Sequence, residues 1–334
     1  MSRPSTLRAS ARVRAVKPAP PAPPVPMKAR SFISLGDFTP EAIDRCLELA
    51  AELKAARAAG RRADYAPLAN RHVALLFDKP SLRTRVTFEV AVRELGGSPI
   101  LLPADVALGS REPVADVARN LERWVDVVVI RTFAQQIVEE FACAAPSLRL
   151  INALTDEEHP CQALADVLTL RERFGELTGR TIAYVGDGNN VATSLAEACV
   201  MQGMHVHIAS PEGYELPPAI RQRVAVEARD GATLTMFNDP IAAVRGASAV
   251  YTDVWTSMGQ ENETAIRKRA FAGFQVNEAL MASADAEAIF MHCLPAHRGE
   301  EVSAGVMDGA SSVVFDQAEN RLHAQKALLA MLFE

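Results

Sequence analysis

Residues 72 to 95 read HVALLFDKPSLRTRVTFEVAVREL, in which a largely apolar run is followed by a polar loop and a longer mixed stretch. The run 72–77 is short and bounded by polar residues, which is typical of a buried strand. The stretch 81–95 ends at Gly96 and Gly97, as helices commonly do. A strand, a loop and a helix in this order form the repeating unit of a parallel sheet.

The same alternation continues along the chain after residue 31. A first helix is expected from Thr39-Pro40 to about Gly60, because Thr is a good N-cap and Pro suits the first turn. Further strands are expected at 100–102, 126–131, 148–152, 181–185, 205–209, 234–236, 249–253, 288–292 and 313–315. Further helices are expected at 114–123, at 160–174 and from 316 to the end. We therefore predict an α/β fold of two doubly wound parallel-sheet domains, joined by bridging helices that include the C-terminal helix.

Length and composition limit the class of protein. A chain of 334 residues exceeds the size at which a single hydrophobic core stops growing. We expect one domain over 31–155, completed by the C-terminal helix 318–334, and a second over 156–317. The formal net charge of −6 argues against a nucleic-acid-binding surface, and no apolar run reaches the roughly 20 residues of a membrane helix. Five scattered cysteines, none spaced C-x-x-C, indicate a reduced intracellular protein without a disulfide framework or zinc knuckle, and we expect it in the cytoplasm.

The N-terminal 30 residues differ from the rest. They contain seven basic residues, no acidic residue and seven of the twenty prolines. Such a segment cannot bury enough apolar surface to order itself, so we expect disorder over 1–30. Two interpretations remain open: an unstructured extension upstream of a natural start near Met27, or a transit peptide that would place the protein in an organelle matrix.

The loop 78–85 carries the first chemically suggestive residues. Ser81 is expected to cap the helix that follows, whose free N–H groups and positive dipole end then favour an anion. Arg83 and the Thr84 hydroxyl would complete a phosphate site. The alternative is that these arginines form surface ion pairs, as Arg85 could with Glu89 one turn later.

Two further segments present donors where a chain turns. Arg131 closes an apolar strand, where it would face either an anion or a structural carboxylate. His159 and Gln162 stand at the start of a helix and could aim donors at a carbonyl oxygen, although a capping role is equally open. Cys161, between them, is expected to pack in the core.

The segment Gly186-Asp-Gly-Asn-Asn-Val191 sits between a strand and a helix. It fails the dinucleotide fingerprint, because Val191 stands where a small residue is needed. Asn189 and Asn190 in this loop could instead offer amide donors and acceptors to a small polar ligand. His205 and His207 share one strand face but have no third ligand, so we predict no metal site.

The last two suggestive segments also follow strands. Asp253 could hold an ammonium group, and Ser257-Met-Gly259 is either a loop that folds over a site or a solvated loop. Residues 292–298 (HCLPAHR) place a thiol, a forced turn and basic residues at the end of a strand. In open α/β sheets that edge is where ligands bind.

Together these segments resemble the aspartate/ornithine carbamoyltransferase family, over residues 27 to 334. The stretch 81–85 is similar to its carbamoyl-phosphate motif, and His159-Pro-Cys-Gln162 is similar to its second signature. Asp253 with 257–259, and the stretch 292–295, resemble the two segments that separate ornithine-using from aspartate-using members. All four occur in the family's order, which makes the resemblance specific.

The resemblance implies transfer of the carbamoyl group from carbamoyl phosphate to the side-chain amine of L-ornithine, giving L-citrulline and phosphate, in arginine biosynthesis or breakdown. It implies a homotrimer whose first domain binds carbamoyl phosphate and whose second binds ornithine, with no metal or organic cofactor. The implied carbamoyl-phosphate contacts are Ser81, Leu82 (through its backbone), Arg83, Thr84, Arg131, His159, Gln162, Cys293, Leu294 and Arg321. The implied ornithine contacts are Asn190, Asp253, Ser257 and Met258. The implied catalytic residues are Arg83, Arg131, His159, Asp253 and Cys293, the last as a contact that orients ornithine.

Two positions depart from the family's pattern. Leu82 stands where Thr is common, so a backbone contact survives and a hydroxyl contact does not. Ala107 stands where many relatives carry a Gln that reaches a neighbouring subunit's carbamoyl phosphate. We expect lower affinity for carbamoyl phosphate from this change.

Three rival functions remain. One is a carbamoyltransferase for an acylated ornithine or another diamine, but the intact 257–259 loop argues against it. A non-catalytic binding paralogue is supported only by Leu82 and Ala107. A nicotinamide-dependent dehydrogenase is a rival at the level of the fold, and Val191 counts against it.

Overall fold

The computed structural model describes residues 30–61, 65–102, 108 and 111–334. The N-terminal extension up to residue 29 and Ala107 lie outside the described residues, so the predictions made for them stay predictions. Among the residues described, no helix is both long and apolar enough to cross a bilayer.

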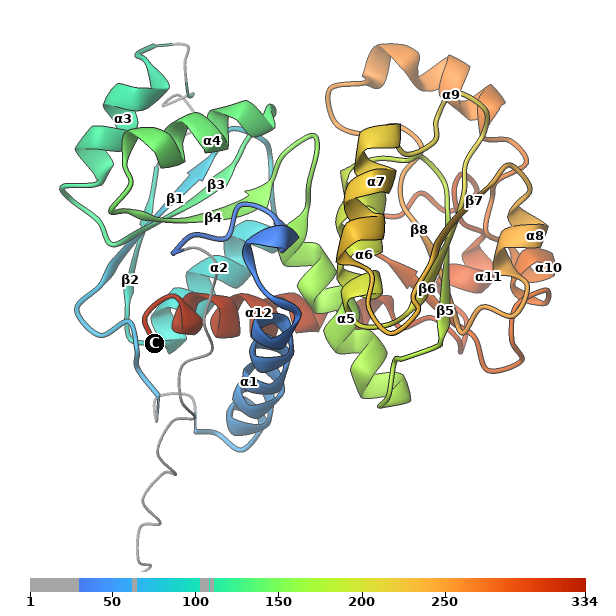
Figure 1. The fold of residues 1–334 in the computed structure, drawn as a ribbon, viewed down its shortest axis with the longest axis horizontal. Helices are drawn as coiled ribbons and strands as arrows, with labels where there is room; N and C mark the ends of the chain where they lie inside the picture. Colours follow the sequence, from blue (N-terminus) through green and yellow to red (C-terminus); the bar gives the residue numbers. More distant parts are fainter. Residues whose placement is uncertain (1–29, 62–64, 103–107, 109–110) are drawn as a thin grey trace, which may run out of the picture.

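The first half is built on a four-stranded parallel sheet in the order β2-β1-β3-β4 (Figure 1). Strands β1 and β3 each alternate between two cores: Val73 and Leu75 face one and Ala74 and Leu76 the other. Helices α3 and α4 cover the second face, and α1 and α2 cover the first. The elements of this half are η1 (Leu35–Asp37), α1 (Pro40–Ala58), β1 (His72–Phe77), α2 (Arg83–Glu94), β2 (Ser98–Leu101), α3 (Val114–Leu121), β3 (Val127–Arg131), α4 (Gln135–Ala144) and β4 (Arg149–Leu154).

The second half is built on a five-stranded parallel sheet in the order β7-β6-β5-β8-β9. Helix α5 leads into it and α6 packs on the same face, while α8 to α11 lie with the opposite face. The elements are α5 (Pro160–Phe174), β5 (Thr181–Val185), α6 (Asn190–Met201), β6 (His205–Ala209), α7 (Pro218–Glu227), β7 (Leu234–Phe237), α8 (Pro240–Val244), β8 (Ala249–Thr252), η2 (Glu261–Glu263), α9 (Thr264–Ala270), α10 (Glu278–Met281), β9 (Ile289–His292), α11 (Ala304–Met307) and α12 (Val314–Met331). The predicted α/β class with two parallel sheets is confirmed.

Helix α12 joins the halves. It begins beside β9 of the second sheet and runs under the first half, where it packs against α1, α2 and α5 (Figure 1). Through it and α5, one hydrophobic core extends from Val73 and Leu75 of the first sheet to Ile182 and Tyr184 of the second.

The predicted strand at 313–315 is wrong. Ser312 forms only an isolated bridge with Phe290, and α12 begins at Val314. In the helix Val314 is buried while Phe315 is 70% exposed. Adjacent apolar residues point in different directions on a helix, so this short run could not reveal its period.

Candidate functional site

A cleft of about 950 Å³ opens where the carboxyl ends of both sheets face each other. Parallel strands bring their ends to one edge, so residues far apart in sequence meet there. Lys79 and Arg131 follow or end strands of the first sheet, and Asp187, Asp253 and Cys293 follow strands of the second.

All but one of the predicted site residues line this cleft. Those that do are Ser81, Leu82, Arg83, Thr84, Arg131, His159, Asn190, Asp253, Ser257, Met258, Cys293, Leu294 and Arg321. Gln162 is the exception: it is buried behind the cleft wall, where its amide binds Asp166 and Arg321.

The N-terminus of α2 differs from the prediction in two details. Leu82, already helical in its backbone, is the N-cap, and no side chain caps the helix, so Ser81 does not have the predicted capping role. Glu89 pairs with Arg93 rather than Arg85. The first-turn N–H groups therefore meet no capping side chain among the residues that the structure describes, and they lie at the cleft with Arg83 and Thr84.

Two buried guanidinium groups reach the cleft without a carboxylate partner among the described residues. Arg131 is 6% exposed and its Nε has no hydrogen-bond partner there. Arg321 donates from Nη1 to Gln162 Oε1 (2.5 Å) and from Nη2 to Thr84 Oγ1 (2.9 Å), both neutral acceptors. The carboxylate pair considered for Arg131 is therefore not found.

Positive charge in the cleft changes the acid–base behaviour of its groups. Burial, with repulsion from Arg321 and Arg83, lowers the pKa of Arg131 to about 10. Burial and the same kind of repulsion hold the pKa of His159 well below its ordinary value, so its imidazole is neutral. An anion bound here would relieve the repulsion, and a neutral imidazole can donate one hydrogen bond to it.

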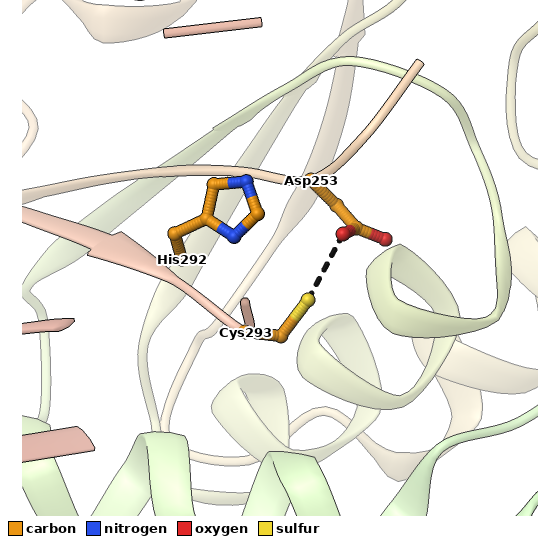
Figure 2. A group of neighbouring side chains, drawn as sticks. All are labelled: Asp253, His292 and Cys293. Carbon is orange, nitrogen blue, oxygen red and sulfur yellow. Dashed lines mark hydrogen bonds between the residues drawn. The ribbon is translucent and has the colours of Figure 1, made fainter. Parts of the chain in front are cut away.

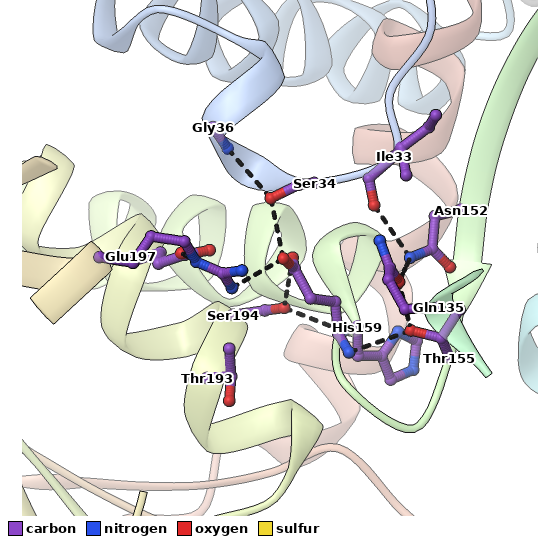
Figure 3. Close-up of polar contacts among 12 residues, drawn as sticks. Ile33, Ser34, Gly36, Gln135, Asn152, Thr155, His159, Thr193, Ser194 and Glu197 are labelled. Carbon is purple, nitrogen blue, oxygen red and sulfur yellow. Dashed lines mark hydrogen bonds and ion pairs between the residues drawn. The ribbon is translucent and has the colours of Figure 1, made fainter. Parts of the chain in front are cut away.

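The backbone before α5 is held by a network that reaches both halves (Figure 3). His159 N donates to Ser194 Oγ on α6 (2.9 Å). The buried Glu158 carboxylate accepts from Ser34 Oγ (2.8 Å) and Arg223 Nη2 (2.8 Å). Arg223 also binds the buried Glu197, so one cation serves two carboxylates.

On the opposite wall an acid and a thiol face each other (Figure 2). Cys293 Sγ donates to Asp253 Oδ1 (2.9 Å), and Asn189 Nδ2 donates to Asp253 Oδ2 (2.8 Å). Burial and the Asp253 charge hold the pKa of the Cys293 thiol well above its ordinary value. A thiol that keeps its proton is a poor nucleophile, and its S–H can donate a weak hydrogen bond to a carboxylate.

Asp253, His292 and Cys293 lie close enough together to suggest a metal site, but the hydrogen bonds oppose it. Leu294 N donates to His292 Nδ1 (2.8 Å), so that nitrogen is an acceptor. The other nitrogen then carries the proton and faces Glu301 Oε1 at 3.2 Å. Both imidazole nitrogens are therefore engaged.

Three residues near the cleft were not among the site residues assigned from the sequence. Lys79 is buried, pairs with Asp156 and lies 4.3 Å from the centre of the Phe133 ring. Asn189 caps α6 and holds Asp253. Arg267 ties the 254–263 loop to the second sheet by donating to Asp187 Oδ2 (2.7 Å) and Trp255 O (3.2 Å). Only Asn189 had a local signal, as an Asn directly before a helix.

Comparison with known proteins agrees with this geometry. Residues 30–172 match the family model described as aspartate/ornithine carbamoyltransferase, carbamoyl-P binding domain, and residues 178–332 match that of the Asp/Orn binding domain. The chain is 53% identical to the ornithine carbamoyltransferase of Parasynechococcus marenigrum (strain WH8102) over 308 residues, which cover 92% of this chain and 95% of the relative. It superposes with a TM-score of 0.86 on the ornithine carbamoyltransferase structure from Pyrococcus furiosus, at 46% identity, covering 92% of this chain and 98% of that one. The corresponding structure from Gloeobacter violaceus gives a TM-score of 0.82 at 47% identity, covering 91% and 99%.

The buried carboxylates beside His159 predict a pH effect on stability. Burial, with repulsion from Glu158, raises the pKa of Glu197 from 4.5 to about 8. The folded state therefore keeps a proton that the unfolded chain loses, and stability falls as pH rises from about 5 to about 8. The glutamine in Glu197→Gln is neutral at every pH. The melting temperature of this variant minus that of the wild type should therefore increase between about pH 5 and about pH 8 and stay constant above it. Thermal unfolding followed by circular dichroism at several pH values measures this difference.

Glu48→Gln is the matched control, because the Glu48 side chain is 63% exposed. Its melting temperature relative to wild type should not change with pH. A difference for Glu197→Gln that is constant with pH would contradict the assignment.

Proposed function

The chain belongs to the aspartate/ornithine carbamoyltransferase family, and we propose that it transfers the carbamoyl group of carbamoyl phosphate to the side-chain amine of L-ornithine, releasing L-citrulline and phosphate. The observation that carries this proposal is the division of one cleft into two walls of opposite character. Arginines that have no carboxylate partner in the described part of the chain line the first half's wall, and Asp253 with Cys293 lines the second half's wall. A doubly charged anion suits the first wall and an ammonium group suits the second.

We assign carbamoyl phosphate to the first half, comprising 31–155 with 318–334, and the amino acid to 156–317. The phosphate lies at the uncapped start of α2 and is held by Ser81, Arg83, Thr84, Arg131 and Arg321. Leu82 has no hydroxyl group, so it contributes its backbone, and its side chain is 73% exposed. Leu294 closes the floor between the two substrates.

The same cationic wall stabilises the reaction's oxyanion. Attack on the carbamoyl carbon moves negative charge onto its oxygen, and Arg83, Arg131 and the neutral His159 supply fixed donors there. Gln162 was expected to join them, but its amide already binds Arg321 and Asp166. We propose that Gln162 instead holds Arg321 in place.

Ornithine's other groups are held by the second half. Asp253 binds its α-ammonium group, and Asn190, Ser257 and Met258 line the space around it. An aspartate substrate would bring a second carboxylate close to Asp253, which like-charge repulsion disfavours. Cys293 keeps its proton and orients the substrate through Asp253.

The proposed reaction balances without an enzyme nucleophile. Ornithine's side-chain ammonium, with an ordinary pKa of about 10.4, loses a proton to solvent to become the nucleophile. The free amine forms a bond to the carbamoyl carbon, the bond from that carbon to the phosphate oxygen breaks, and the nitrogen's second proton passes to the departing phosphate. The arginines retain the departing phosphate until the products leave.

We also propose that the enzyme is a cytoplasmic homotrimer in arginine metabolism. The five cysteines are all free thiols, which supports a reducing compartment. Light scattering on the purified protein should give three times the chain mass of 36.0 kDa. A mass equal to one chain would contradict the trimer.

A citrulline assay tests the substrate assignment. Purified protein should form citrulline from carbamoyl phosphate and L-ornithine, and no carbamoylated product from N-acetylornithine or putrescine in parallel reactions. Turnover with one of those amines and not with ornithine would overturn the specificity. The absence of turnover with all three would favour a binding paralogue.

Arg83→Ala tests the phosphate wall. Because Arg83 is assigned to the anion in both ground and transition states, kcat/KM should fall at least about a hundredfold. Arg93→Ala, on the same helix with its side chain 61% exposed, should leave the rate unchanged. Circular dichroism should report both variants as folded. A folded Arg83→Ala variant with near-normal kcat/KM would refute the assignment.

A further inference from the structure

Asp166 lies behind the cleft wall on α5, with no exposed surface, and does not line the cleft. Its Oδ1 accepts hydrogen bonds from Gln162 Nε2 and Gln317 Nε2, both at 2.7 Å. Its Oδ2 accepts from the Tyr251 hydroxyl at 3.3 Å. A carboxyl group buried among neutral donors is costly, which calls for a reason beyond packing.

One reason to bury a carboxyl group here is its effect on the phosphate side of the cleft. An amide group has a donor end and an acceptor end. Because Asp166 accepts from the NH2 of Gln162, the carbonyl of Gln162 faces Arg321 Nη1 at 2.5 Å. Arg321 then reaches Thr84 Oγ1 with its other nitrogen. The orientation of the guanidinium group in the cleft is thus set through Gln162.

The other reason to bury the Asp166 carboxyl group is its effect on the amino-acid side of the cleft. Gln317 also gives its NH2 to Asp166, so its carbonyl accepts from His292 N at 3.0 Å. His292 is followed by Cys293, which donates to Asp253. The turn that carries the thiol is thus held to the same carboxyl group as the guanidinium.

We propose, building on the function proposed above, that Asp166 is a positioning residue for both substrates, because it fixes the direction of the two glutamine amides that hold Arg321 and the 292–293 turn. It touches neither substrate. One side chain thereby fixes the position of Arg321 relative to the 292–293 turn.

This role depends on hydrogen-bond geometry and not on charge. Burial raises the pKa of Asp166 to about 7, so the group changes protonation near neutrality. A proton on Oδ2 would donate to the Tyr251 oxygen in place of the hydrogen bond that Tyr251 donates, and Oδ1 would still accept from the two amides. A carboxamide has the same pattern, with an oxygen for the glutamines and an NH2 for Tyr251.

Asp166→Asn and Asp166→Leu test whether Asp166 acts through hydrogen-bond geometry or through charge. The first keeps the donor and acceptor pattern without the charge, and the second removes both. Asp166→Leu should raise the KM values for carbamoyl phosphate and ornithine, and the Kd for inorganic phosphate by calorimetry, about tenfold or more, as expected when a charged group loses an oriented acceptor. Asp166→Asn should stay within about threefold of wild type in all three. Equal losses in both variants would overturn the proposal, as would a folded Asp166→Leu variant with wild-type constants.

Thr169→Val is the matched control. Thr169 is buried one turn later on α5 and also binds α12, through Asn320 Nδ2 at 3.0 Å. Within the described chain it has no hydrogen bond to a residue of the cleft. It should leave the three constants unchanged. If Asp166→Leu does not fold, Gln317→Met removes only the second branch and should raise the KM for ornithine more than that for carbamoyl phosphate. Equal increases would then contradict the proposal.

The calorimetry separates this inference from the function on which it rests. A wild type that makes citrulline, with Asp166 variants that do not differ from one another, refutes only the positioning role. A wild type that binds phosphate without making citrulline refutes the proposed function, and the phosphate Kd values still decide the role of Asp166. A wild type that does neither overturns both.

Discussion

Positive charge held inside a cleft is the constraint on which the rest of the site depends. Arg83, Arg131 and Arg321 come from α2, β3 and α12, and burial together with repulsion from the other two lowers the pKa of Arg131. A carboxylate beside each would remove the repulsion but also remove the attraction for an anion. The chain instead gives Arg321 neutral acceptors, Gln162 and Thr84, and leaves Arg131 without a partner among the described residues. The scaffold holds the charges in place without neutralising them.

The shared core explains how such a cleft can lie between two sheets. The cleft takes one wall from each half. These two walls would be poorly aligned if the halves were independent bodies, because interfaces between domains commonly move. Here the apolar faces of both sheets belong to one cluster through α5 and α12. The Asn190 amide also donates to the backbone carbonyl of Thr155, directly across the boundary between the halves. The cationic wall and the acidic wall therefore face each other in the folded chain.

The sequence predicted what depends on local pattern. Strand ends and their charged residues follow from periodicity and residue type, so nearly every strand and thirteen of the predicted cleft residues were found. The hydrogen-bond partners of the polar side chains were not predicted, because the sequence does not show which residue an amide or carboxyl group will contact in the fold. Gln317 binds Asp166 from 151 residues away. Lys79 and Arg267 were missed for the same reason, and the strand at 313–315 was wrong because three apolar residues carry no period.

The position of α12 in the chain has a consequence for biosynthesis. This helix follows every other element of both halves, yet it carries Arg321 and Gln317 and packs on α1 and α2. A growing chain folds from its N-terminal end, so both sheets leave the ribosome before α12 does. Until that helix docks, the core is uncovered along one side and the anion wall lacks one of its arginines. The complete site can therefore form only after α12 has been synthesised, because a chain cut short before residue 314 would lack Gln317 and Arg321.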